Sequence, residues 1–455
     1  MRKILFFLLL ILYSLNAVST SINGTFTTMA NTTIYAFIDD DYITDAQKLV
    51  AQSEVDASGK FALEITTKNV QKICVKTIDY IFYLYCFEGN NYNVKLSLPN
   101  ANFKKDNKQL LKVKIIEEPQ PQINLQINAA DSVIDKFVTS HYKQFVHPRS
   151  LKLAVDSLKK KYPAAICNTP YVVQYFMYAI ASLDEASAMR ETYFYKHYTN
   201  NEIASQNSPA FYNYFNQHYA SYFESIITKP CFGNAATLIN EQHNCEAILQ
   251  KMRVCDTILK NDSLRELLFV KGLYKLYYKR EYKKESIEMM LNYMTFKSEF
   301  ESVKKVAKNL VKKITKLNIG TKAPNFNLLS SANDSIKLES LKGKLVYICF
   351  TNYSNLTWLT HLSILERLQL LYDKKILIVT ITLAKDMPQL KALQNDKKLS
   401  GLILNGYDNL ALNDNYLIDE LPKYYLIDAD GDILKNNNCS PVDGIEEIIK
   451  AELKK

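Results

Sequence analysis

Over the last third of the chain, continuous apolar runs alternate with segments in which apolar residues recur at helical spacing. This pattern predicts one α/β unit. The pattern consists of an apolar run at 345–350, helical spacing at 356–372, a second apolar run at 376–381, a strand at 421–428, a turn at Asp430-Gly431 with a returning strand, and a helix at 444–453. A continuous run of six apolar residues is typical of a parallel strand buried on both faces. We therefore predict an α/β domain over residues 317–455.

The pattern before residue 317 is of two kinds. Over 20–125, short alternating segments are separated by turns such as 56–59, which predicts a small antiparallel β-sandwich. Over 126–316, apolar residues recur at helical spacing, for example at Phe211 and Phe215, which predicts an all-α region. A chain of 455 residues has room for about three such domains.

Three short motifs give the last domain a family resemblance. They are Gly320-Thr321-Lys322-Ala323-Pro324-Asn325-Phe326 at its start, Leu341-Lys342-Gly343-Lys344 before the first apolar run, and Leu421-Pro422 before Tyr424-Tyr425-Leu426-Ile427-Asp428. In this order they resemble the exported thioredoxin-like proteins of Bacteroidetes type, which include thiol-disulfide reductases and peroxiredoxin-like redoxins. The resemblance covers about a third of the chain and implies a thioredoxin-like fold there. The N-terminal sandwich is similar to the transthyretin-like modules that precede such domains.

The redox-active cysteines of that family are missing. The family has Trp-Cys-x-x-Cys where the first strand turns into the helix, and the resemblance places Asn355 at the nucleophilic cysteine and Trp358 at the resolving one. Disulfide exchange needs a thiolate at the helix N-terminus and a second thiol that resolves the mixed disulfide. We therefore predict no catalytic residue here. Asn355 or Ser354 is expected to cap the helix instead.

Pro422 stands where the family has a cis-proline, whose preceding backbone can pair with an extended peptide. We predict a cis Leu421–Pro422 bond and a shallow binding groove formed by Leu421, Pro422, Tyr353 and Trp358. Two alternatives stay open. The first is that Pro422 only preserves the fold and binds no peptide. The second is that Trp358 is buried in the first turn of its helix and does not line the groove.

The first residues indicate export. Met1-Arg2-Lys3, an apolar core over 4–12, and small residues up to Ser19 are typical of a signal peptide, which we assign to residues 1–19. No cysteine follows the apolar core, so we expect no lipoprotein anchor. No apolar stretch is long enough for a transmembrane span. The expected location is the periplasm or another extracytoplasmic compartment.

Eight cysteines lie after this segment, and an oxidising compartment permits disulfides between them. Cys74 and Cys86 lie on successive predicted strands and could form a cross-strand disulfide. Cys231, Cys245 and Cys255 lie in the helical region, where one pair could form. The sequence alone does not assign the pairing.

The composition argues against several kinds of partner. The net charge is +9. The basic clusters are Lys159-Lys160-Lys161, Lys279-Arg280 with Lys283-Lys284, and Lys304-Lys305 with Lys308, Lys312 and Lys313. On helices such clusters are usually solvated faces, and attraction to an anionic membrane surface or an acidic partner is the alternative. Because no nucleic-acid motif, phosphate-binding loop or zinc-binding histidine spacing occurs, we expect no nucleic-acid partner, cofactor or metal.

Two functions are compatible with these features. The first is an exported, non-catalytic protein that binds another envelope protein or an extended peptide. The second is a periplasmic thiol-disulfide oxidoreductase that uses cysteines outside the usual motif, such as Cys231, Cys245 and Cys255. We favour the first because the reacting groups are absent from the expected geometry.

Overall fold

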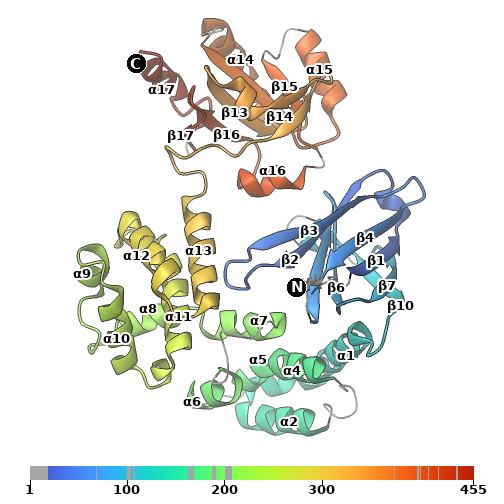
Figure 1. Ribbon diagram of the computed structural model, residues 1–455, viewed down its shortest axis with the longest axis vertical. Helices are drawn as coiled ribbons and strands as arrows, with labels where there is room; N and C mark the ends of the chain where they lie inside the picture. The colour runs from blue at the N-terminus through green and yellow to red at the C-terminus, as the bar shows by residue number, and fades with distance from the viewer. Residues whose placement is uncertain are drawn as a thin grey trace, which may run out of the picture. The chain divides into compact units, whose positions relative to one another are not determined.

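The computed structural model describes residues 19–67, 69–99, 104–105, 108–161, 169–186, 191–199, 208–372, 375–396, 399, 401–407, 409–418, 420–436 and 439–454. Residues 1–18 of the expected signal peptide and Cys167 lie outside the described residues. The chain divides into two compact units, Met1–Gly233 with Leu249–Lys271, and Asn234–Ile248 with Gly272–Lys455. Within the described residues, strands come first, helices follow, and mixed elements come last, in the order that the sequence pattern predicts (Figure 1).

The N-terminal strands form two sheets around a common core. One sheet has the order β10-β7-β1-β4 and the other the order β3-β2-β5-β6-β9-β8. Ile22 and Leu63 from the first sheet and Ile73 and Phe82 from the second are buried in the same cluster, which is the packing of a β-sandwich. The strands are β1 (Ser19–Thr25), β2 (Thr33–Asp39), β3 (Gln47–Glu54), β4 (Lys60–Thr66), β5 (Gln71–Lys76), β6 (Tyr80–Cys86), β7 (Asn91–Ser97), β8 (Lys104–Lys105), β9 (Lys108–Leu110) and β10 (Lys112–Glu117), with the short helix η1 (Thr27–Met29).

The expected Cys74–Cys86 disulfide is wrong, because both thiols are free. In the β5–β6 register Cys74 lies opposite Tyr83, and Cys86 lies opposite Gln71. Cys86 is therefore three positions along β6 from the partner of Cys74, and side chains alternate between faces with a period of two. The two sulfurs thus point to opposite faces of the sheet.

The helical elements follow the sandwich. They are α1 (Ile123–His141), η2 (Tyr142–Val146), α2 (Pro148–Lys161), α4 (Pro170–Ala179), α5 (Ala181–Glu185), α6 (Glu191–Phe194), η3 (Tyr195–Thr199), α7 (Pro209–His218), α8 (Tyr222–Ile227), α9 (Ala235–Asn240), α10 (Cys245–Cys255), η5 (Ile258–Lys260), α11 (Asp262–Leu276), α12 (Lys284–Lys297) and α13 (Glu301–Thr315). Phe211 and Phe215 of the predicted aromatic stripe are fully buried. The stripe is therefore a packing surface.

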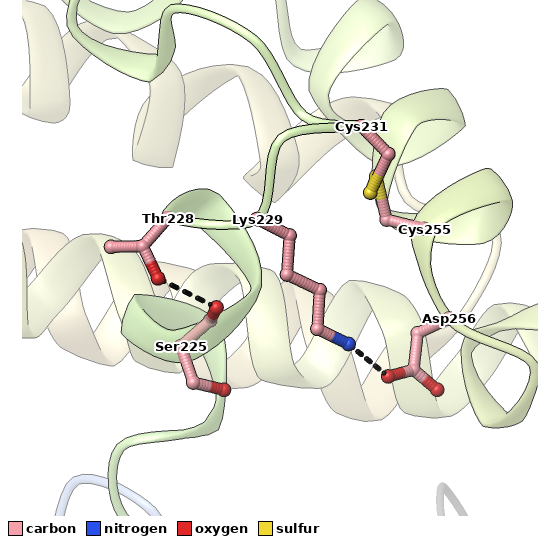
Figure 2. The surroundings of a disulfide bond; sticks show 6 residues. All are labelled: Ser225, Thr228, Lys229, Cys231, Cys255 and Asp256. Atoms are coloured by element: carbon pink, nitrogen blue, oxygen red, sulfur yellow. Dashed lines mark hydrogen bonds and ion pairs between the residues drawn. A yellow bond between two sulfur atoms is a disulfide. The ribbon is translucent and has the colours of Figure 1, made fainter.

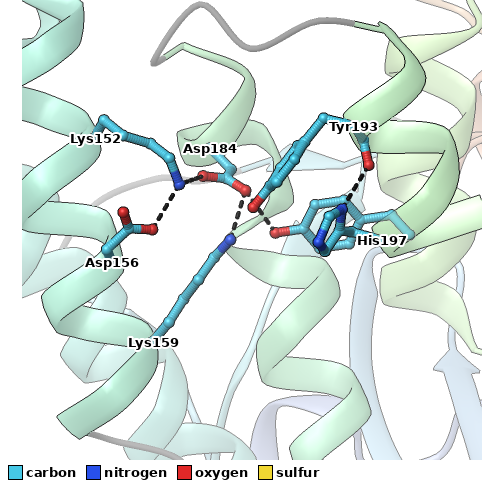
Figure 3. A network of polar contacts seen from close by, with 7 residues as sticks. Lys152, Asp156, Lys159, Asp184, Tyr193 and His197 are labelled. Carbon is cyan, nitrogen blue, oxygen red and sulfur yellow. Dashed lines mark hydrogen bonds and ion pairs between the residues drawn. The ribbon is translucent and has the colours of Figure 1, made fainter.

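A buried carboxylate joins α2, α5 and η3 (Figure 3). Asp184 contacts Lys159 Nζ at 2.5 Å and Lys152 Nζ at 3.5 Å, and it accepts a hydrogen bond from the Tyr198 hydroxyl at 3.0 Å. Burial acts to raise the pKa of Asp184, but the ammonium groups and the hydroxyl together lower it below its ordinary value. The buried negative charge is thereby compensated, and the network serves to hold these helices together.

The C-terminal elements form a seven-stranded sheet with the order β12-β11-β15-β14-β13-β16-β17. β13 is parallel to β14 and antiparallel to β16, and β16 is antiparallel to β17. With α14 between β13 and β14 and α17 after β17, this is the strand order and direction of a thioredoxin-like fold. The elements are β11 (Asn327–Ser330), β12 (Ser335–Lys337), η6 (Leu338–Leu341), β13 (Leu345–Thr351), α14 (Leu356–Leu371), β14 (Ile376–Thr382), α15 (Met387–Asn395), β15 (Leu402–Asn405), α16 (Leu410–Asn415), β16 (Lys423–Ile427), β17 (Ile433–Lys435) and α17 (Ile445–Glu452).

Both faces of this sheet are covered. All seven residues of β13 are buried. Tyr347 and Cys349 pack on the side of α14 and α17, while Val346 and Phe350 pack on the side of α16 (Figure 1). The continuous apolar run at 345–350 thus corresponds to a central strand, as predicted.

Candidate functional site

The first turn of α14 lies where the resemblance places the missing cysteines. Asn355 is the N-cap of the helix, and its Oδ1 accepts a hydrogen bond from the Trp358 backbone N–H at 2.8 Å. Its Nδ2 donates to the Leu421 carbonyl oxygen at 3.0 Å. Of the two residues proposed as the cap, Asn355 is thus confirmed, whereas the Ser354 hydroxyl donates to Asn352 Oδ1. One amide side chain satisfies a helix N–H and also holds a second segment of the chain.

That second segment contains Pro422, and the Leu421–Pro422 bond is cis, as predicted. The Leu421 carbonyl oxygen is engaged by Asn355, whereas the Leu421 N–H donates to no described residue. Proline has no N–H, so this corner offers an approaching strand one backbone donor and the remaining lone pair of Leu421. A peptide could therefore pair here only in part.

Trp358 does not belong to a binding surface. Its side chain is fully buried and packs in the same cluster as Leu365 and Leu426. The indole N–H makes no hydrogen bond of good geometry to a described residue, but it lies close enough to the Cys349 thiol to oppose the rise of that thiol's pKa. The proposal that Trp358 contributes to the groove is therefore wrong, and the alternative that it is buried is confirmed. It lies on the inward face of α14, three residues after the cap.

Two apolar side chains are exposed at the same end of the helix. Tyr353 is 39% exposed and Leu356 is 79% exposed. The Tyr353 backbone N–H donates to the Asp386 carboxylate at 2.5 Å, which fixes the loop before α14. Leu356 was missed in the sequence analysis, although a helical wheel places it away from the inward positions 358, 361 and 365. A groove between Tyr353 and Pro422 stays a prediction.

Buried titratable groups lie beneath this turn. His361 Nδ1 and the Tyr424 hydroxyl are 2.8 Å apart, and burial lowers the pKa of His361 despite an opposing effect of Asp443. Burial strongly raises the pKa of the Cys349 thiol, with weaker opposing effects of Tyr424 and Trp358. Burial also raises the pKa of Cys439 to about 12. These thiols are protonated and enclosed, so they are poor nucleophiles.

Among the described residues of the helical region, Cys231 and Cys255 form a disulfide, with Cα atoms 5.7 Å apart (Figure 2). The expectation that one pair forms among the three cysteines is confirmed. Cys245 is free and buried at the other end of α10, and burial raises its pKa to about 12. Ten residues of helix separate Cys245 from Cys255, a distance of about 15 Å. Cys245 therefore cannot act as a resolving thiol for this disulfide.

The surroundings of the disulfide disfavour a thiolate. Cys255 is the last residue of α10, where the helix dipole is negative. Asp256 follows directly and forms an ion pair with Lys229 at 2.9 Å (Figure 2). A redox-active cysteine usually lies at a helix N-terminus beside a positive charge. Cys255 lies instead at the C-terminal end of its helix, and the nearby Lys229 ammonium group is paired with the Asp256 carboxylate.

Neither a metal site nor a membrane-spanning helix occurs among the described residues. The described residues contain no group of three or more His, Cys, Asp or Glu side chains that could hold a metal ion. Within the same residues, no helix combines the length and the apolar character that crossing a bilayer requires.

Comparisons with known proteins give partial likenesses. No protein-family model and no curated protein sequence matches the chain. Solved structures similar to part of it include the thioredoxin domain of a thiol-disulfide oxidoreductase from Bacteroides vulgatus (20% identity, TM-score 0.26, 29% of this chain and 99% of that one). Others are a thiol:disulfide interchange protein from a Bacteroides species (21%, 0.28, 30% and 92%) and a thiol-disulfide oxidoreductase from Bacteroides fragilis (21%, 0.25, 28% and 99%). With TM-scores this low, the thioredoxin-like assignment rests on the strand order.

Proposed function

We propose that this chain is an exported protein whose thioredoxin-like region binds another envelope protein or an extended peptide without thiol-disulfide chemistry. The observation that carries the proposal is the position of Asn355. Its side chain caps α14 and bonds to Leu421, where the resemblance requires a thiolate. An amide can neither attack a disulfide nor form a mixed one.

The state of the other cysteines supports the same conclusion. Cys74, Cys86, Cys245, Cys349 and Cys439 are the free cysteines among the described residues, and all are buried. The Cys231–Cys255 disulfide has surroundings that disfavour a thiolate. No cysteine among the described residues therefore has the surroundings that the alternative, an oxidoreductase using cysteines outside the usual motif, requires.

The proposed binding surface combines a backbone donor with apolar side chains. The Leu421 N–H donates to no described residue, and Tyr353 and Leu356 are exposed near the start of α14. Exposed aromatic and aliphatic groups that can be desolvated are typical anchors of a protein interface. The partner is therefore expected to contribute an apolar side chain and an extended backbone.

The test compares two charge substitutions at exposed leucines of the same helix. Leu356→Asp alters the proposed surface, and Leu370→Asp is the matched control because Leu370 is 71% exposed near the other end of α14. The immobilised proteins are incubated with envelope extract, and bound proteins are identified by mass spectrometry. We expect a partner that is retained by the wild type and by Leu370→Asp and lost with Leu356→Asp. Equal retention by both variants would contradict the proposed surface.

Export is a separate part of the proposal and rests on the N-terminal pattern. Sequencing of the mature protein should find a start near residue 20 and no remaining apolar core. A mature chain that begins at Met1 would contradict export.

A further inference from the structure

Three tyrosines and two lysines form a continuous cluster around the ends of α11 and α13. The Lys284 Nζ lies 5.1 Å from the centre of the Tyr277 ring, and the Lys313 Nζ lies 5.4 Å from that of Tyr274. The Tyr278 ring contacts both tyrosines, with centroid distances of 5.3 and 5.4 Å. The Tyr277 hydroxyl lies 3.2 Å from Glu288 Oε1 and 3.4 Å from the Ile314 carbonyl oxygen, so the end of α13 lies beside α11. We call these five residues the tyrosine–lysine cluster.

This cluster brings together two basic segments that are distant in the sequence. The exposed cations around it are Lys279, Arg280, Lys283, Lys284, Lys312 and Lys313, and they outnumber the nearby carboxylates Glu281, Glu285 and Glu288. Ammonium groups within about 6 Å of an aromatic ring are held by the ring quadrupole. The positive charges are therefore concentrated on an aromatic base.

Tyr278 is the exposed tyrosine of the cluster, with 64% of its surface accessible. Tyrosine has an apolar ring and a polar hydroxyl, which is why it is enriched where a bilayer meets water. Long lysine side chains can lay their alkyl stems on apolar surface while the charge reaches anionic headgroups. Protein interfaces, by contrast, are depleted of lysine.

We propose that the tyrosine–lysine cluster docks the protein onto an anionic lipid surface. The attachment is peripheral, with Tyr278 in the headgroup region and the surrounding lysines on lipid phosphates. It is independent of the binding surface at Asn355 and Leu421, so either proposal can fail without the other.

The test is co-sedimentation of the full mature chain with phosphatidylcholine vesicles and with vesicles that also contain phosphatidylglycerol. The test variant is Lys284→Glu with Lys313→Glu. The control is Lys143→Glu with Lys160→Glu, which makes the same charge change at exposed positions. Lys143 also lies over an exposed ring, at 5.9 Å from the Tyr142 centroid. Circular dichroism establishes that each variant is folded.

We expect binding to the anionic vesicles that weakens at high salt, because surface charges are screened beyond the Debye length. The test variant should bind at least about tenfold more weakly, since each lysine near an anionic surface contributes roughly a fivefold factor. The control should bind like the wild type, and Tyr278→Ser should bind more weakly than the wild type. Equal binding to neutral and anionic vesicles, or an equal loss in the control, would overturn the proposal. Binding to polyglutamate without binding to vesicles would overturn it in favour of an acidic protein partner.

Discussion

Asn355 donates a hydrogen bond from its Nδ2 to the carbonyl oxygen of Leu421, at 3.0 Å and across 66 residues of sequence. The same side chain accepts the Trp358 N–H at the start of α14. Two segments that the resemblance associates with catalysis and with peptide pairing are thereby joined by one amide. This side chain therefore stabilises the fold at a position where the family that the sequence resembles has a nucleophile.

Substitutions of Asn355 separate its two contacts. Asn355→Ala removes the cap and the hydrogen bond to Leu421, each of which contributes about 1 kcal/mol. The free energy of unfolding should therefore fall by about 2 kcal/mol. Asn355→Ser keeps a capping oxygen and loses only the bond to Leu421, so its loss should be about half as large. Urea unfolding measures both, with the exposed Ser354→Ala as the control. Equal losses for the Ala and Ser variants would contradict a separate role for the Leu421 bond.

Trp358 is the single tryptophan of the chain and is fully buried. The intrinsic fluorescence should therefore have the short-wavelength emission of an apolar environment and resist quenching by acrylamide. Unfolding in urea provides the exposed reference on the same molecule. Emission of the folded protein that already matches this reference would restore Trp358 as a surface residue.

The pairing of the cysteines is accessible to peptide mapping after alkylation without reduction. We expect a peptide linked through Cys231 and Cys255, with Cys74 and Cys86 alkylated once the chain is unfolded. Cys231→Ser should lower the free energy of unfolding by about 3 kcal/mol, the usual effect of a bond that closes a loop of this length. A linked peptide containing Cys74 and Cys86 would show that the β5–β6 register is wrong.

His361 should make the stability of the thioredoxin-like region depend on pH. Burial lowers its folded pKa, so the unfolded chain binds the proton more tightly. The stabilising difference is present above the unfolded value of about 6.5 and is lost as the pH falls toward the folded pKa. Urea unfolding at pH 7.5 and pH 5.5 should therefore show a larger loss at the lower pH for the wild type than for His361→Gln. Identical losses would contradict a buried neutral histidine.

Local sequence patterns predicted the strands and helix caps for which neighbouring residues alone give a strong preference. The apolar run at 345–350 is typical of a strand covered on both faces, and the observed β13 is such a strand. Asn355 or Ser354 could be predicted as the cap because a polar side chain before a helix satisfies a free N–H, and the structure has Asn355 there. The Cys74–Cys86 disulfide was predicted wrongly for a different reason. Which residues of two paired strands lie opposite each other depends on their register, and the sequence of either strand alone does not determine that register.

The site was predicted less completely than the fold. The burial of Trp358 and the exposure of Leu356 both follow from the rotation of α14 about its axis, which is set by packing against the sheet. The hydrogen bond from Asn355 to Leu421 joins residues 66 positions apart, so no local sequence pattern predicts it. The tyrosine–lysine cluster likewise requires α11 and α13 to lie together.

We expect no thiol-disulfide turnover by this chain, and the measurement is the reduction of insulin by the purified mature chain with dithiothreitol. We predict a rate equal to the buffer control for the wild type and for Cys231→Ser. As a positive control, Asn355→Cys with Trp358→Cys introduces the family's thiol pair at the start of α14, and any activity of that variant shows that the assay detects this fold. Turnover by the wild type that disappears in Cys231→Ser or Cys255→Ser would overturn the proposed binding function and establish an oxidoreductase that uses the helical-region disulfide.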